Sequence, residues 1–116
     1  MNLESTSITQ PVFFIPHGGG PCFFMDWQPA DTWTEMAEFL KSIPSRLPEQ
    51  PSAILIISGH WQTSTFSVTA GNKPDLIYDY YGLPEHTYEL TYPASGEPAL
   101  AKRVSQLLSD AGLDNE

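Results

Sequence analysis

The sequence predicts an α/β fold, with a mostly parallel central sheet flanked by helices. Two short apolar runs rich in β-forming residues, at positions 11–16 and 53–57, have the composition of buried strands. A segment with helical periodicity lies between them, so strand, helix and strand form one βαβ unit. At 116 residues, the chain 1–116 is expected to be a single domain or the N-terminal part of a larger one.

The first expected strand, Pro11–Pro16, is too short for a helix and ends abruptly. It is followed by His17, by three glycines at positions 18–20 and by Pro21. Three glycines before a proline cannot continue regular structure, so this segment is expected to be a loop. His17 occupies its first position, at the carboxyl end of the strand.

A helix is expected next. Asp31 or Thr32 can cap its start and Pro44 is expected to end it. Its apolar face has the i, i+3, i+4, i+7 spacing of one side of a helix. The face consists of Trp33, Met36, Ala37 and Leu40.

The second expected strand, Ala53–Ile57, is uniformly apolar and leads directly into Ser58–Trp61. Ligands in open α/β sheets collect just beyond the carboxyl ends of parallel strands. His17 and His60 both occupy that position, which makes them the leading candidates for a functional site.

The rest of the chain is expected to hold one half-exposed strand, one irregular segment and one helix. Thr65–Ala70 alternates in polarity like a strand, and Leu76–Pro93 is rich in tyrosine, which indicates a loop with one or two short strands. In the final helix, Pro98 suits the first turn and Gly112 can end it. The apolar face of that helix contains Leu100, Ala101, Val104, Leu107, Leu108 and Ala111.

Charge and composition exclude several classes of partner. The net charge is −9, so phosphate backbones and anionic lipid would repel the chain, and neither nucleic acid nor a membrane surface is an expected partner.

The sequence has no apolar stretch of transmembrane length and its start has no signal-peptide pattern. The single cysteine, Cys22, excludes an internal disulfide and fits a reducing compartment. We therefore expect a soluble, cytoplasmic protein.

Several residues have more than one reading. His17 and His60 could converge on one metal ion, because imidazole suits iron, zinc and copper, or each could be an ordinary loop histidine. The glycines could cradle a phosphate, although neither a dinucleotide-binding fingerprint nor a Walker lysine accompanies them. Cys22 is expected to be a small buried apolar residue rather than a nucleophile, and His86 a residue at the surface or at a pocket edge. The tyrosines could line an aromatic pocket or simply pack on half-buried segments.

Three segments in series resemble one family. They are FFIPHGGGP at 13–21, AILIISGHW at 53–61 and YDYYGLPEHTYELTYPASG at 78–96. Together they resemble the class III extradiol ring-cleaving dioxygenases, in the branch of 4,5-DOPA dioxygenase-like proteins. In one departure from the family pattern, Ser95 stands where the family usually has a second proline.

The resemblance implies a mononuclear metal site with His17 and His60 as two of its ligands. Fe(II) is then the expected catalytic metal, Zn(II) is possible in its place, and the substrates are a small aromatic diol and O2. Family members are much longer, so the resemblance implies that the fold is an incomplete version of a larger αβα domain. The later half of family members carries the third ligand and the histidine proposed as acid/base catalyst. No residue here matches those positions, so the catalytic and substrate-binding residues stay unassigned and His86 is not given either role.

Two functions follow as expectations. The first is the N-terminal portion of a metal-dependent extradiol dioxygenase, which opens the ring of a catechol with O2 and has little or no activity alone. The alternative is a non-catalytic small α/β domain that binds a metal or a partner. An open sheet would leave an exposed edge, through which the chain could associate with another chain.

Overall fold

A computed structural model of the chain describes residues 8–116. The chain divides into two compact units, Met1–Ile54 and Leu55–Glu116. The elements in order are the 3₁₀ turn η2 (Cys22–Phe24), helix α1 (Thr34–Arg46), the 3₁₀ turn η3 (Glu85–Tyr88) and helix α2 (Pro98–Asp110). η2 and α1 belong to the first unit, and η3 and α2 to the second.

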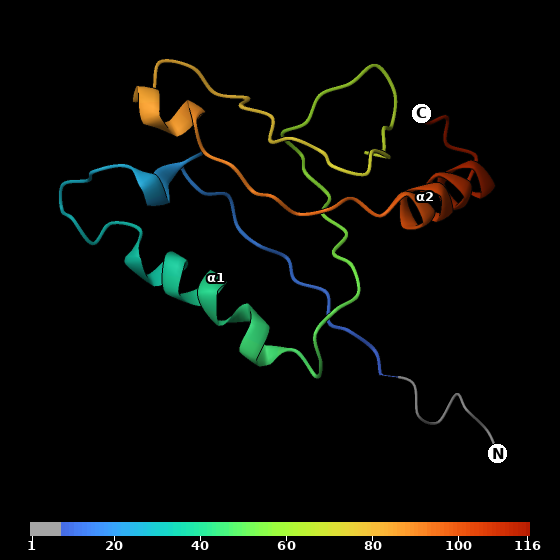
Figure 1. Cartoon of the computed structure of the whole chain (residues 1–116), viewed down its shortest axis with the longest axis horizontal. Helices are drawn as coiled ribbons and strands as arrows, with labels where there is room; N and C mark the ends of the chain where they lie inside the picture. Colours follow the sequence, from blue (N-terminus) through green and yellow to red (C-terminus); the bar gives the residue numbers. More distant parts are fainter. Residues whose placement is uncertain (1–7) are drawn as a thin grey trace. The chain divides into compact units, whose positions relative to one another are not determined.

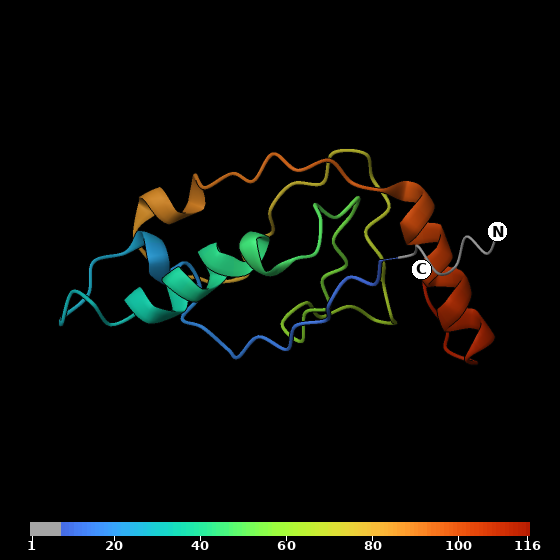
Figure 2. The ribbon, with the colours of Figure 1, turned by 90° about the horizontal axis from the view of Figure 1, so that it is seen from below.

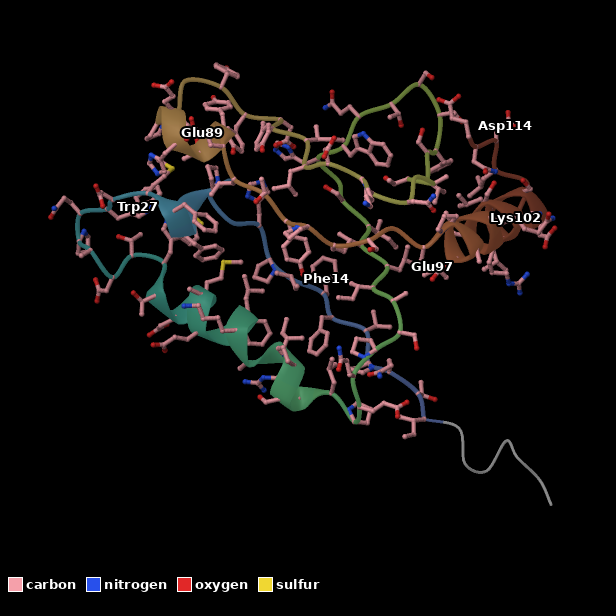
Figure 3. All side chains as sticks on the ribbon, in the orientation of Figure 1. Phe14, Trp27, Glu89, Glu97, Lys102 and Asp114 are labelled. Atoms are coloured by element: carbon pink, nitrogen blue, oxygen red, sulfur yellow. The ribbon has the colours of Figure 1, made fainter. Side chains whose placement is uncertain are left out.

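The predicted parallel sheet is wrong: residues 8–116 contain no strand, and Figures 1 and 2 draw no strand arrow there. Both apolar runs follow an irregular path and stay in contact with solvent, with Val12 97%, Phe14 99% and Ile57 91% exposed. Figure 3 locates Phe14 on the first run. Apolar β-branched composition favours a strand only where a neighbouring backbone supplies ladder hydrogen bonds, and the described residues supply none to these runs. An exposed sheet edge is therefore also absent from the described part of the chain.

Helix α1 confirms the predicted apolar face but extends further than predicted. Trp33 is its N-cap, and all four residues of the predicted face are partly buried. Pro44 lies inside the helix, which ends at Arg46. A proline this close to a helix end costs little, since few later residues depend on the hydrogen bond that it removes.

Side chains stabilise that last turn of α1. The Ser42 hydroxyl donates to the Phe39 carbonyl at 2.6 Å, and the Ser45 hydroxyl donates to the Ser42 carbonyl at 2.6 Å. The Arg46 Nε donates to the Ser42 hydroxyl at 2.8 Å, and its guanidinium lies 5.3 Å from the centre of the Phe39 ring. These side-chain contacts support the last turn, in which Pro44 has no N–H to donate to the Leu40 carbonyl.

The glycine loop of the first unit packs against α1 and η2. A Cβ placed on Gly19 would lie 2.9 Å from the Trp33 ring and 3.2 Å from the Cys22 Cβ. Only glycine fits at so close an approach. Cys22 is 1% exposed, which confirms its prediction as a small buried residue, and its carbonyl accepts a hydrogen bond from the Trp27 indole at 2.7 Å.

Helix α2 confirms both predicted boundaries. Pro98 occupies the first turn, and Gly112 follows the C-cap with φ +79°. The Gly112 N–H donates to the Ser109 carbonyl at 2.9 Å and the Leu113 N–H to the Leu108 carbonyl at 2.9 Å. This pair of bonds defines a Schellman motif, which requires the left-handed backbone that glycine adopts freely.

The segment expected as a strand at 65–70 makes a single parallel bridge, between Phe66 and Asn115. The Glu116 N–H donates to the Phe66 carbonyl and the Val68 N–H donates to the Glu116 carbonyl, both at 2.9 Å. Side chains add to this pairing: the Thr65 hydroxyl donates to the Asp114 carbonyl at 2.8 Å. The prediction holds only as far as this short pairing with the segment after α2.

No helix within residues 8–116 is both long enough and apolar enough to span a membrane.

Candidate functional site

His17 lies in the first unit, directly after the exposed apolar run, and its side chain is exposed. Its Nδ1 atom lies at hydrogen-bond distance from the carbonyl oxygen of Gly18. A carbonyl can only accept, so this contact places the ring proton on Nδ1. A neutral imidazole with its proton there presents its lone pair at Nε2, the form that metal-binding histidines commonly take.

His60 lies in the second unit, in the turn that follows residues 53–57. Its backbone N–H donates to the Ser58 hydroxyl at 3.2 Å. Its Nδ1 contacts Asp79 Oδ2, and the two side chains are 60% and 42% exposed. A carboxylate again accepts, so Nδ1 is the donor of this contact, and in the neutral form of the ring the lone pair is then at Nε2.

The structure thus brings His60 together with a residue that sequence reasoning missed. Asp79 is 19 positions away, in a segment without helical or strand periodicity, so no spacing rule connects it to His60. The available signal was local: Asp79 is the acidic residue between Tyr78 and Tyr80 in the segment that carries the family resemblance.

Asp79 sits within a packed group of tyrosines. The Tyr80 and Tyr88 ring centres are 5.1 Å apart, and the Tyr78 ring lies 6.2 Å from Tyr80 and 6.1 Å from Tyr88. The Tyr78 hydroxyl donates to the Leu90 carbonyl, and the Tyr80 hydroxyl to the carbonyl of Thr87, which is fully buried. Tyrosine packing and hydroxyl bonds hold this segment together, which favours the packing reading for these three residues.

Tyr81 and Tyr92 differ from that group, because both are largely exposed. His86 lies on η3 with an exposed side chain, as predicted for a surface residue. One hollow of about 370 Å³ lies in the first unit beside Trp33, and another of about 770 Å³ lies in the second beside Tyr78 and Tyr92. Neither His17 nor His60 is among their lining residues.

The donor chemistry of the two histidines fits a transition metal, because imidazole nitrogen suits iron and zinc. Within residues 8–116, no group of three or more His, Cys, Asp or Glu side chains is gathered so that it could hold a metal ion. His17 and His60 belong to different units. Each histidine therefore lies in its own local surroundings, His17 beside Gly18 and His60 beside Asp79.

Comparison with known proteins decides the family. A family model described as the catalytic LigB subunit of aromatic ring-opening dioxygenase matches residues 11–116, which include both histidines and Asp79. The chain belongs to this LigB family. The match confirms the resemblance that the three sequence segments carry.

Individual relatives agree with this assignment. The chain is 36% identical over 112 residues to the dioxygenase tasH of Hapsidospora irregularis, and the match covers 89% of this chain and 33% of that protein. The chain is 38% identical over 102 residues to a 4,5-DOPA dioxygenase extradiol of Beta vulgaris, a match that covers 87% of this chain and 36% of the relative. It is 34% identical over 104 residues to a 4,5-DOPA dioxygenase extradiol of Escherichia coli, a match that covers 90% of this chain and 35% of the relative. The chain thus spans about one third of the length of these relatives. No solved structure matches.

Extradiol dioxygenases of the LigB family generally depend on a metal. The family name also implies a small aromatic substrate and O2.

Proposed function

We propose that His17 and His60 supply two imidazole ligands to the metal centre of an aromatic ring-opening dioxygenase whose substrate is a catechol. The observation that carries this proposal is the match of the LigB family over residues 11–116, within which both histidines follow the apolar runs of the family motifs. The Nδ1 contacts of both rings support it, because each leaves the Nε2 lone pair as the donor to a metal.

Fe(II) is the metal we propose for catalysis, with Zn(II) able to occupy the same ligands. A bound metal would act as a Lewis acid and hold diol and O2 close together for ring opening. The residues of this chain contribute only the positioning of the metal. His17 and His60 each donate one nitrogen lone pair, and their hydrogen bonds to Gly18 and Asp79 fix the direction of that lone pair before the metal binds.

Two imidazoles do not complete such a centre, so we expect the purified 116-residue chain to cleave catechols weakly or not at all. Oxygen uptake and the absorbance of a ring-opened product, measured with added Fe(II) and a catechol, test this expectation. Rapid ring opening by the chain alone would contradict it.

Metal binding is the direct test of the ligand assignment. Equilibrium dialysis with Zn(II) should give weaker binding for His17→Ala and for His60→Ala than for the unmodified chain. Mutation of a residue that is hydrogen-bonded to a metal ligand typically weakens metal binding by roughly 10-fold to 100-fold, and loss of a ligand itself should weaken it more. His86→Ala is the matched control, since His86 is an exposed imidazole outside the proposed set. Equal losses for all three variants would overturn the assignment.

A second candidate function is binding of a partner chain without catalysis. It is favoured by the exposed large apolar side chains on the two apolar runs, Val12 and Phe14 on the first and Ile57 on the second. Apolar groups exposed together mark interaction surfaces. Metal affinity that does not respond to His17→Ala or His60→Ala, together with stable association, would favour this candidate.

A further inference from the structure

We propose that Asp79 is a positioning residue for His60, holding the imidazole in the tautomer and orientation that direct Nε2 to the metal. This inference rests on the proposed function, in which His60 is a metal ligand. The observation that carries it is the contact between His60 Nδ1 and Asp79 Oδ2 within the second unit.

The chemistry of the two groups determines the direction of the hydrogen bond. An ionised carboxylate has no proton to give, so His60 Nδ1 must be the donor. A neutral imidazole carries a single N–H, and its other nitrogen is therefore the unprotonated one. Fixing the proton on Nδ1 thus selects Nε2 as the metal donor, and the partial negative character passed to the ring raises its basicity.

Local structure restricts where Asp79 can place its carboxylate. On either side of it, the Tyr78 and Tyr80 hydroxyls are bonded to the carbonyls of Leu90 and Thr87. Thr87 is itself held by its hydroxyl, which donates to the Pro84 carbonyl at 2.6 Å. The backbone at position 79 is therefore anchored on both sides, which limits the positions open to its short side chain.

The exposure of the pair indicates that its role is orientation rather than stability. His60 and Asp79 are 60% and 42% exposed, and water screens the attraction between exposed groups, so such pairs add little to folding stability. His17 has a comparable arrangement with a backbone acceptor, the Gly18 carbonyl, which no side-chain substitution can remove. Of the two acceptors, the Gly18 carbonyl and the Asp79 carboxylate, only the carboxylate can be tested by mutation.

The first experiment measures the tautomer without any metal. The chain is labelled with 15N-histidine, and two-bond 1H–15N correlations are recorded at a pH above the titration range of histidine. His60 should show the Nδ1–H form in the unmodified chain and shift toward the Nε2–H form, which free imidazole side chains prefer in water, in Asp79→Ala. Asp79→Asn keeps an acceptor oxygen and should retain part of the Nδ1–H form. Asp75→Ala removes another exposed carboxylate, four residues before Asp79, and should leave His60 unchanged.

The second experiment measures Zn(II) affinity by equilibrium dialysis. Asp79→Ala should bind about 10-fold to 100-fold more weakly, Asp79→Asn should lose less, and Asp75→Ala should match the unmodified chain. An unchanged His60 tautomer in Asp79→Ala would overturn the positioning role. A shifted tautomer with unchanged affinity, in a chain where His60→Ala does lose affinity, would overturn its relevance to the metal. Unchanged affinity in His60→Ala itself would instead overturn the ligand assignment, while the tautomer measurement still decides the hydrogen bond.

Discussion

Gly19 and Gly18 are neighbours in one loop, yet the space around them differs. A Cβ at Gly19 would lie 2.9 Å from the rigid Trp33 ring, whereas a Cβ at Gly18 would lie 3.8 Å from the flexible end of Met36. The distance to Trp33 is much shorter than a van der Waals contact, whereas the distance to Met36 is an ordinary van der Waals contact. Packing of the loop against α1 therefore depends on the absence of a side chain at one of these positions only.

Gly19→Ala should destabilise the first unit by about 1–3 kcal/mol, the usual cost of overpacking, because Trp33 or the loop must move. Gly18→Ala should change stability much less. Urea unfolding followed by tryptophan fluorescence measures both, since Trp27 and Trp33 belong to this unit. Equal stability of the two variants would show that the loop does not pack on α1 in solution.

The site residues illustrate what sequence reasoning could and could not reach. His17 and His60 were found because each directly follows an apolar run, which is a signal in the local sequence. The partner of His60 was missed because Asp79 is reached through the folding of a tyrosine-rich segment that has no period. An acceptor for Nδ1 can come from any carboxylate or carbonyl that tertiary structure brings near, and spacing does not encode it.

At the level of elements, the helices were predicted well and the strands were not. The apolar face of α1 and the residues Pro98 and Gly112 at the ends of α2 are local signals, because helix hydrogen bonds join residues four apart. On the predicted face of α2, Leu107 is 49% exposed. A strand needs a partner strand that lies elsewhere in the chain. The composition of residues 11–16 and 53–57 therefore indicates a tendency to form strands but does not identify a pairing partner. Pro44 was misjudged for a related reason, since the serine and arginine bonds that support the last turn of α1 were not considered.

Helix α2 offers a test of its C-terminal motif. Gly112→Ala should cost roughly 1–2 kcal/mol, because a side chain is strained at a φ of +79°. Gly112→Asn should cost less, since asparagine tolerates the left-handed region. Far-UV circular dichroism during urea unfolding gives the free energy, and amide exchange of Leu113 reports on its bond to Leu108. Similar losses for alanine and asparagine would argue against the Schellman motif.

On the scale of the whole molecule, charge and apolar exposure act in opposite directions. The net charge of −9 makes copies of the chain repel one another, while exposed groups such as Phe14 and Ile57 favour contact. The repulsion is screened by salt, with a Debye length of about 10 Å at 0.1 M, and the apolar attraction is not.

We therefore expect the isolated chain to associate, and to associate more strongly as salt is raised. Sedimentation velocity over a range of protein and salt concentrations measures this. Phe14→Ser and Ile57→Ser should each weaken association, whereas the exposed polar change Thr63→Ser should not. A monomer at every concentration and salt level would contradict this prediction.

The burial of Cys22 has a practical consequence. It is the only thiol in the chain, it is 1% exposed, and it lies against the loop that Gly19 keeps close to Trp33. A disulfide reagent can reach it only when this packing opens transiently, so the rate of labelling reports the frequency of local opening. The reaction rate of this one thiol is therefore a kinetic measure of local opening in the first unit, obtained without unfolding the second.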